Sequence, residues 1–202
     1  MSATTVLPVT DPPLTEMHHR ALAAATERGK PIRRAGRVAT FNAWTTAILA
    51  ALSAPFAVFS LAGLLVFAAL AAIAWNEFRG RRRLLELDPA GASILGRNQL
   101  GLLAMIIIYC MWALYSNLWG GGSIEAELRA NPQLGAAIGS VQGFDELYRT
   151  IVVVLYGSVI ALSAVFQGAN ALYYFSRRKY VARYVRETPA WVIDLKRATS
   201  TP

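Results

Sequence analysis

The chain has 202 residues, of which 55% are hydrophobic and 16% are charged, and its formal net charge is +8. Soluble domains usually carry about 25% charged residues, so this composition indicates an integral membrane protein and argues against an ordinary soluble domain. A basic balance is also found in nucleic-acid-binding proteins, but here the basic residues are confined to particular loops. No zinc-finger spacing or RNA-binding aromatic motif is present, and we expect no nucleic acid partner.

Residues 1–34 are predicted to form a cytoplasmic N-terminal tail with one short helix. Apolar residues recur at helical spacing from Leu14 onward, and Gly29 followed by Pro31 is typical of a helix end. His18 and His19 are the only histidines. Because adjacent histidines point to different helix faces and have no acidic or cysteine neighbour, the tail predicts no metal site.

The stretch from Val38 to Trp75 contains no charged residue. It is too long for one membrane span, and Ser53-Ala54-Pro55 interrupts it in the middle. We therefore predict two transmembrane helices, about 35–54 and 55–78, joined as an antiparallel hairpin. The whole domain, residues 35–175, is predicted to contain four such helices.

The second pair of spans is expected after a polar segment. Residues 79–98 carry five arginines and are predicted to be a loop that turns at Asp88-Pro89. The third span is placed at about 99–119 and ends before a run of three glycines. An outer loop at 120–147 leads into the fourth span, at about 148–175, which completes a second hairpin.

Residues 176–202 are predicted to form a basic amphipathic C-terminal helix at the cytoplasmic membrane surface. Apolar residues from Tyr180 to Val185 alternate with arginines, and Thr188-Pro189 is typical of the start of a further short helix. An alternative is that the fourth span continues past the membrane and packs on the other cytoplasmic segments. The sequence favours neither arrangement over the other.

The basic residues predict the orientation of the chain. Six Lys or Arg precede the first span, five lie between the second and third, seven follow the fourth, and only two lie on the far side. Positively charged loops stay in the cytoplasm, so both termini are expected inside. Arginine-rich, alanine-rich composition favours a bacterial inner membrane. Anionic lipid head groups are expected to contact Arg79, Arg81, Arg82, Arg83, Arg177, Arg178 and Lys179.

The predicted spans have no ionisable residue within their cores, which argues against proton relays and ion-coupled carriers. Their polar side chains offer one possible intramembrane site, formed by Gln167, Asn170 and Asn42. Gln167 and Asn170 are three residues apart and share a helix face. The simpler interpretation is that these amides hydrogen-bond between helices.

Small residues form a stripe on the fourth span, at Gly157, Ala161, Ala164, Gly168 and Ala171. Their spacing of alternately four and three residues keeps them on one face and permits close approach of another helix. That helix is expected to come from the same chain, most simply the alanine-rich second span. A helix of a second subunit is the alternative.

No catalytic constellation, cofactor-binding motif or metal-ligand set is visible, and the single cysteine, Cys110, has no histidine near it in sequence. We therefore predict a non-enzymatic inner-membrane protein. Its expected role is an accessory or scaffolding subunit of a larger membrane complex, in contact with other membrane subunits or with copies of itself. The alternative is an oligomeric channel or small-solute transporter, and a third possibility is a membrane-embedded enzyme acting on lipid.

Overall fold

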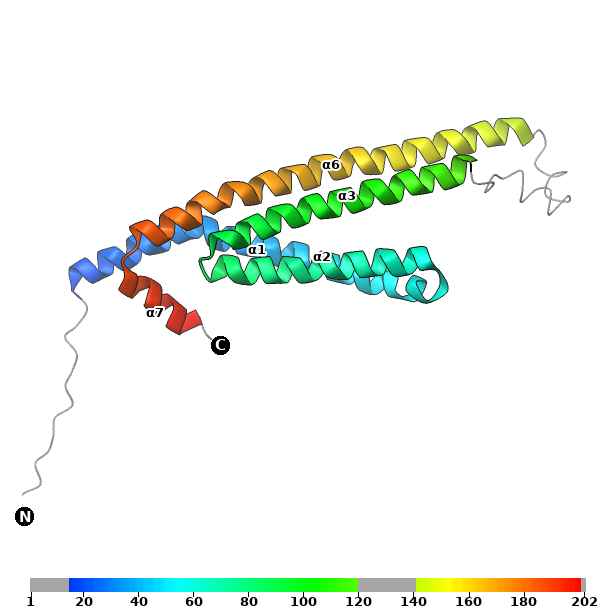
Figure 1. Cartoon of the computed structure of the whole chain (residues 1–202). Coiled ribbons are helices and arrows are strands. Elements are labelled where there is room, and N and C mark those ends of the chain that lie inside the picture. The colour runs from blue at the N-terminus through cyan, green and yellow to red at the C-terminus, as the bar shows by residue number, and fades with distance from the viewer. Residues whose placement is uncertain (1–14, 120–140, 201–202) are drawn as a thin grey trace, which may run out of the picture.

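The computed structural model describes residues 15–119 and 141–200, and within these ranges every regular element is a helix. The helices are α1 (Glu16–Phe59), α2 (Leu61–Leu85), α3 (Pro89–Trp119), α6 (Val141–Glu187) and α7 (Ala190–Ser200) (Figure 1). The predicted all-α class is confirmed for these ranges. The predictions for residues 1–14 and for residues 120–140 of the outer loop lie outside them.

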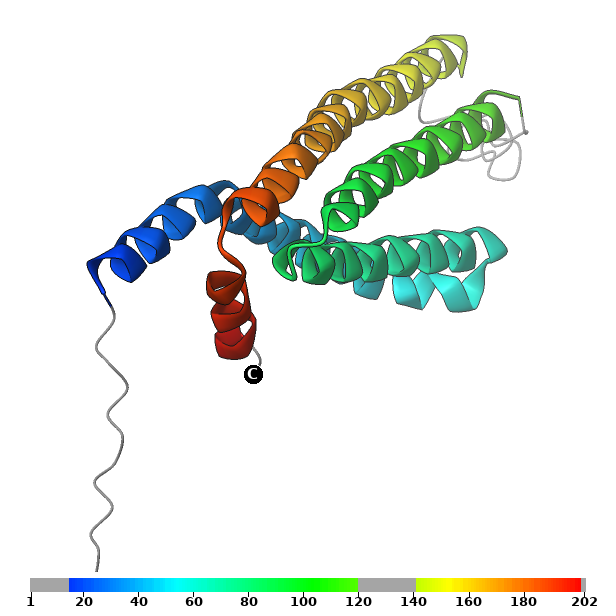
Figure 2. The ribbon, with the colours of Figure 1, turned by 60° about the vertical axis from the view of Figure 1, so that its left-hand side comes forward.

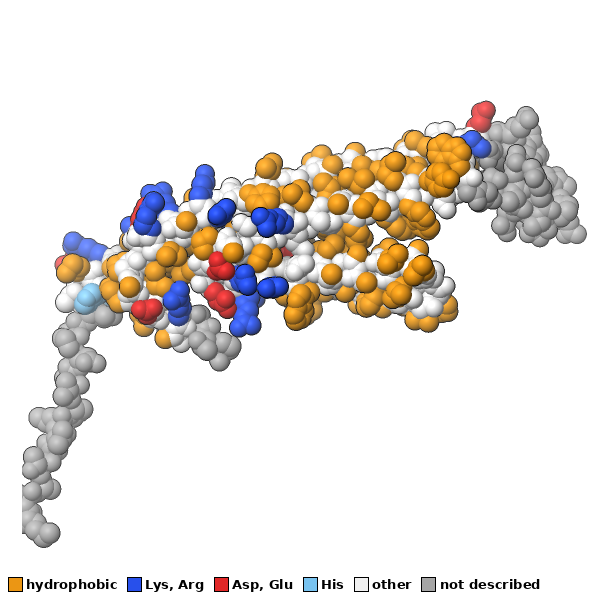
Figure 3. Space-filling view, viewed as in Figure 1, with side chains coloured by type: hydrophobic (Ala, Val, Ile, Leu, Met, Phe, Trp, Pro, Cys, Tyr) orange, Lys and Arg blue, Asp and Glu red, His pale blue; other side chains and the backbone are white. Residues whose placement is uncertain are grey.

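Four helices, α1, α2, α3 and α6, are long and apolar enough to cross a membrane. Hydrophobic side chains cover much of their visible surface, whereas Lys and Arg gather toward the end where α7 lies (Figure 3). We call this end, formed by residues 16–37, 77–97 and 176–200, the basic end. α6 is about 70 Å long, against roughly 30 Å of bilayer hydrocarbon, so it must extend beyond the apolar layer.

The helices pack as two pairs. α1 packs along α2 and α3 packs along α6, and the two pairs meet through α2 with α3 and, over a smaller contact, through α1 with α6. The pairs lie closest at the basic end, where α2 turns into α3, and separate toward the opposite end (Figures 1 and 2). A groove of about 500 Å³ consequently opens between α2 and α3, with Ile73, Asn76 and Asn98 among its lining residues.

α1 is one continuous helix, so the predicted helix end at Gly29 and Pro31 is wrong. Ala25, Ile32 and Ala35 are almost completely buried on one face of α1, in a core that also contains residues of α6 and α7. Proline inside a helix costs about 3 kcal/mol, mainly through a lost hydrogen bond and a steric clash. Burial of this face in the core offsets that cost, which no local sequence pattern reveals.

The turn between the first two spans is at Ser60, and not at Ser53-Ala54-Pro55 as predicted. Pro55 lies inside α1, and Ser60 is the single non-helical residue between α1 and α2. The Ser60 hydroxyl accepts a hydrogen bond from the Gly63 amide, 2.9 Å away, and so caps α2. A Cβ at Gly63 would lie 2.2 Å from the Phe56 carbonyl oxygen, so glycine allows this tight reversal.

Most of residues 79–98, predicted as a loop, is helical. Only residues 86–88 separate α2 from α3. Asp88 caps α3 by accepting a hydrogen bond from the Ala90 amide at 2.8 Å, so the predicted turn at Asp88-Pro89 is confirmed. The helices extend this far because Leu84 and Leu95 are fully buried between them, while the arginines occupy their outer faces.

The C-terminal segment consists of two helices. α6 continues to Glu187, and Val181 and Tyr184, assigned to the predicted amphipathic face, are buried in the core of the basic end. α7 then packs with Val192 fully buried. Its contacts with the rest of the chain include a hydrogen bond from the Lys196 ammonium to the Tyr184 hydroxyl, 2.7 Å long. The segment therefore follows the alternative in which the fourth span continues and packs on other segments.

Candidate functional site

A polar cluster lies where the four long helices meet. Asn98 and Gln99 of α3 both lie beside the carboxylate of Glu77 on α2, and the Gln99 amide donates a hydrogen bond to Glu77 Oε1. From the other two helices, Asn42 of α1 donates to the hydroxyl of Tyr174 on α6 at 3.1 Å. Tyr174 is close enough to Glu77 to interact with it electrostatically. The cluster thus links both helix pairs.

Glu77 is the most unusual member of the cluster. Its side chain is completely buried, and its Oε2 has no hydrogen-bond partner among the described residues. No ion pair involves Glu77 in the described part of the chain. Burying an unpaired carboxylate costs several kcal/mol. The buried Glu77 side chain is therefore more stable when it binds a proton or a cation from the surrounding solution. The arrangement is therefore able to hold a proton or a small cation within the helix junction.

The sequence analysis missed this residue. Glu77 lies at the very end of the predicted second span, next to Arg79 and three further arginines, and a charged residue in that position is typical of a membrane border. Its neighbours on the same helix face are Ala74, Gly80 and Leu84, all buried. An acidic residue on a helix face of small and apolar residues indicates that the acidic side chain is buried. This pattern therefore places Glu77 inside the packing interface.

The predicted intramembrane site is only partly assembled. Asn42 is held by Tyr174, and Asn170 lies one turn before Tyr174 on α6. Gln167 is half-buried on α6, and its Oε1 is buried without a hydrogen-bond partner in the described ranges. No interaction joins Gln167 or Asn170 to Asn42. In the described ranges, the side-chain amides that hydrogen-bond between helices are those of Asn42, Asn98, Gln99 and Asn117, the last by accepting from the Tyr148 hydroxyl at 2.7 Å.

The small-residue stripe on α6 faces outward for most of its length. Gly157, Ala161 and Ala164 are exposed, and only Ala171 is buried within the chain. A Cβ added at Gly157 or at Gly168 would meet nothing within 4 Å. The expected partner, the second span, instead packs along α1 and α3. Most of the stripe is therefore unoccupied by any described helix of this chain.

The seven residues expected to contact anionic lipids all lie at the basic end, with different surroundings. Arg82 pairs with Glu86 at 3.0 Å, and Arg177 stacks on the Tyr173 ring at 4.2 Å. Arg81 donates to Thr40 across the α1–α2 pair. Arg178 and Lys179 are exposed on α6, as is Arg79 on α2. Their exposure leaves the lipid contacts physically accessible, and they remain predictions.

Other candidate chemistry is sparse in the described ranges. No group of three or more His, Cys, Asp or Glu side chains is placed to hold a metal ion in residues 15–119 and 141–200. His18 packs edge-on against Trp191, with the ring centroids 5.1 Å apart, and so helps to join α1 to α7. Cys110 is buried within the helix packing.

Searches of protein-family models, curated proteins and solved structures found no match to this chain. The class of protein is therefore inferred from the length and hydropathy of its helices. Four helices with membrane-spanning length and hydropathy indicate a multi-pass membrane protein with an all-helical fold. Three features of the described chain are candidates for a functional site: the buried polar cluster, the outward face of α6 and the charged surface of the basic end.

Proposed function

We propose that the protein is a non-enzymatic subunit of a larger membrane assembly and that α6 provides its main contact with a neighbouring helix. The observation that carries this proposal is the outward small-residue stripe, with open space beside Gly157 and Gly168. Membrane helices associate through faces of this kind, because small residues permit close backbone approach. The neighbour is a helix of another membrane protein or of a second copy of the chain.

The proposal places the chain in a bacterial inner membrane with both termini in the cytoplasm. This orientation is supported by the excess of Lys and Arg in the segments that form the basic end. α1, α2, α3 and α6 then form two antiparallel hairpins, and the basic end faces the cytoplasm. A fluorescent protein fused after residue 202 should fold and fluoresce. If an enzyme that works only outside the cytoplasm were active when fused at the same place, that result would contradict this orientation.

Cysteine cross-linking in membranes tests the helix contact directly. Ala161→Cys lies on the stripe, and Ala169→Cys is an exposed position of the same helix about 80° away from it around the helix axis. Both variants are made with Cys110→Ser. A short bifunctional thiol reagent should give a cross-linked product of higher mass with Ala161→Cys and little with Ala169→Cys. Equal yields from both positions would contradict a specific α6 interface.

A second candidate function is a channel or small-solute carrier, and Glu77 is the observation that favours it. Ion-coupled carriers use ionisable groups buried between their helices, and this carboxylate has a free oxygen there. Protein reconstituted in liposomes should then carry a flux of protons or monovalent cations that Glu77→Gln abolishes. A flux that Glu77→Gln leaves unchanged, or the absence of any flux, would remove this candidate.

A further inference from the structure

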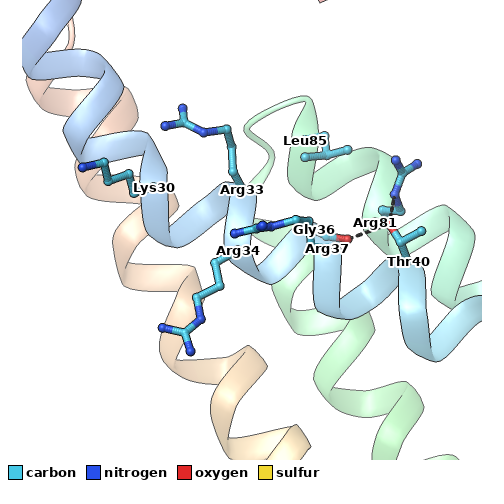
Figure 4. A pocket seen from close by; sticks show the side chains of 8 residues that line it. All are labelled: Lys30, Arg33, Arg34, Gly36, Arg37, Thr40, Arg81 and Leu85. Carbon is cyan, nitrogen blue, oxygen red and sulfur yellow. Dashed lines mark hydrogen bonds between the residues drawn. The ribbon is translucent and has the colours of Figure 1, made fainter.

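A basic groove lies at the basic end between α1 and α2. It has a volume of about 660 Å³, and five cationic side chains line it: Lys30, Arg33, Arg34, Arg37 and Arg81 (Figure 4). The remaining lining residues are Gly36, Thr40 and Leu85, so no carboxylate lines the groove. Five positive charges around one concave surface favour the binding of an anion.

The charges on α1 are poorly compensated within the described chain. Arg34 and Arg37 have no hydrogen bond or ion pair with any described residue. Lys30 pairs with Glu27 at 2.7 Å, on the exposed surface. Like charges three or four residues apart destabilise a helix slightly, and here they follow one another along the same face. An anion in the groove would relieve this repulsion.

Two cations of the groove are held by hydrogen bonds within the chain, Arg33 by the Thr26 carbonyl at 2.9 Å and Arg81 by Thr40. Arg81 Nε donates to the Thr40 hydroxyl at 2.6 Å, and that hydroxyl donates to the Gly36 carbonyl at 2.8 Å (Figure 4). Gly36 also brings the two helices together, because a Cβ there would lie 2.9 Å from Leu85 Cδ2. The guanidinium from α2 is thereby fixed opposite the cations of α1, ready for an oxyanion with several acceptor oxygens.

The surroundings of the groove fit an amphiphile. On the apolar side of Thr40, the Trp44 and Phe78 rings meet edge to face with centroids 5.7 Å apart. The Trp44 side chain is 59% exposed, as expected for a residue that contacts acyl chains or the membrane interface. Trp44 lies two turns beyond Arg37 on α1 and Phe78 lies one turn before Arg81 on α2, so this apolar surface follows the groove along both helices.

We propose that this groove is a binding site for the phosphate of an anionic phospholipid, with the acyl chains lying along Trp44 and Phe78. This inference does not depend on the helix contact proposed for α6. A general excess of arginine on the cytoplasmic side would place cations on any exposed surface of the basic end. It does not account for a single groove lined by cations from two helices, or for the hydrogen bonds that hold Arg81.

Binding measured with the full chain in a neutral detergent tests the proposal. The probes are dioctanoyl phosphatidic acid, dioctanoyl phosphatidylcholine, glycerol 3-phosphate and inorganic phosphate, titrated by calorimetry. The groove variant is Arg34→Gln with Arg37→Gln. The matched control is Arg183→Gln with Arg186→Gln, which removes two exposed cations of the basic end that lie outside the groove and outside the seven predicted lipid contacts. Circular dichroism verifies that both variants keep their helicity.

Phosphatidic acid should bind the native chain more tightly than phosphatidylcholine. The groove variant should weaken that binding by about tenfold or more, and the control by less than about twofold. Thr40→Val should also weaken phosphatidic acid binding, because valine cannot accept the hydrogen bond from Arg81. Thr40→Ser keeps the hydroxyl and should bind phosphatidic acid as tightly as the native chain. Equal losses in groove and control variants, or equal binding of the two lipids, would overturn the site. Glycerol 3-phosphate or inorganic phosphate binding as tightly as the lipid would overturn the lipid assignment in favour of a soluble phosphate compound.

Discussion

Replacing Gly91 with valine should disrupt the packing of the two helix pairs. Gly91 lies where α3 begins, and a Cβ at this position would be 2.4 Å from the Leu84 amide nitrogen and 2.8 Å from the Gly80 carbonyl oxygen. Both neighbours are backbone atoms of α2, so no side-chain movement relieves the clash. The start of α3 must shift away from α2, which separates Leu95 of α3 from Leu84 of α2, and both side chains are fully buried in the core.

We expect Gly91→Val to lower the free energy of unfolding by about 3 kcal/mol or more, at the upper end of the range for overpacked cores. Gly101→Val is the matched control, because Gly101 lies on the same helix and has nothing within 4 Å of its added Cβ. Unfolding in mixed micelles of mild detergent and dodecyl sulfate, followed by circular dichroism, measures both. If the two variants lose the same stability, the close crossing of α2 and α3 is incorrect.

Truncation of Glu77 should have the second large effect. Glu77→Ala removes the acceptor of the Gln99 amide and leaves a cavity at the junction of the helices. Each change is unfavourable, and together they should lower the free energy of unfolding by about 2–4 kcal/mol. Glu77→Gln keeps both the side-chain volume and an oxygen that accepts from Gln99. Its cost should therefore be about 1 kcal/mol or less.

The same unfolding experiment separates these variants. Glu86→Ala is a suitable control, since Glu86 is an exposed acidic residue of the same region that pairs with Arg82 at 3.0 Å. Its loss should change the stability by less than about 1 kcal/mol. A Glu77→Ala protein as stable as Glu86→Ala would contradict the burial of Glu77. A Glu77→Gln protein as unstable as Glu77→Ala would show that the negative charge itself stabilises the fold.

The sequence predicts the membrane-spanning stretches well because hydropathy over about twenty residues is a strong signal. It places helix ends poorly, and for identifiable reasons. Pro31 and Pro55 each predict a helix break, but α1 is continuous through both because its buried face is held by packing. Ser60 and Gly63 hold the actual turn, and a serine followed three residues later by glycine was too weak a pattern to outweigh a proline.

The candidate sites depend on contacts that are distant in sequence. Glu77 and Gln99 come from different helices, and their sequence neighbours gave no indication that they meet. Likewise, the basic groove needs Arg37 and Arg81 opposite each other, which follows from the position of the α1–α2 turn. The spacing of the small residues predicts the stripe, but its outward orientation depends on which face of α6 packs against α3.

The native mass of the particle extracted from membranes tests the proposed association most directly. The chain alone has a mass of 22.0 kDa. After extraction in mild detergent, mass photometry or native mass spectrometry should find it with a stoichiometric partner protein or a second copy. A variant carrying Gly157→Leu and Gly168→Leu should run as the single chain, whereas Ala169→Leu should keep the native mass. A single chain in all three samples would contradict the proposal that this protein acts by joining its α6 face to another membrane helix.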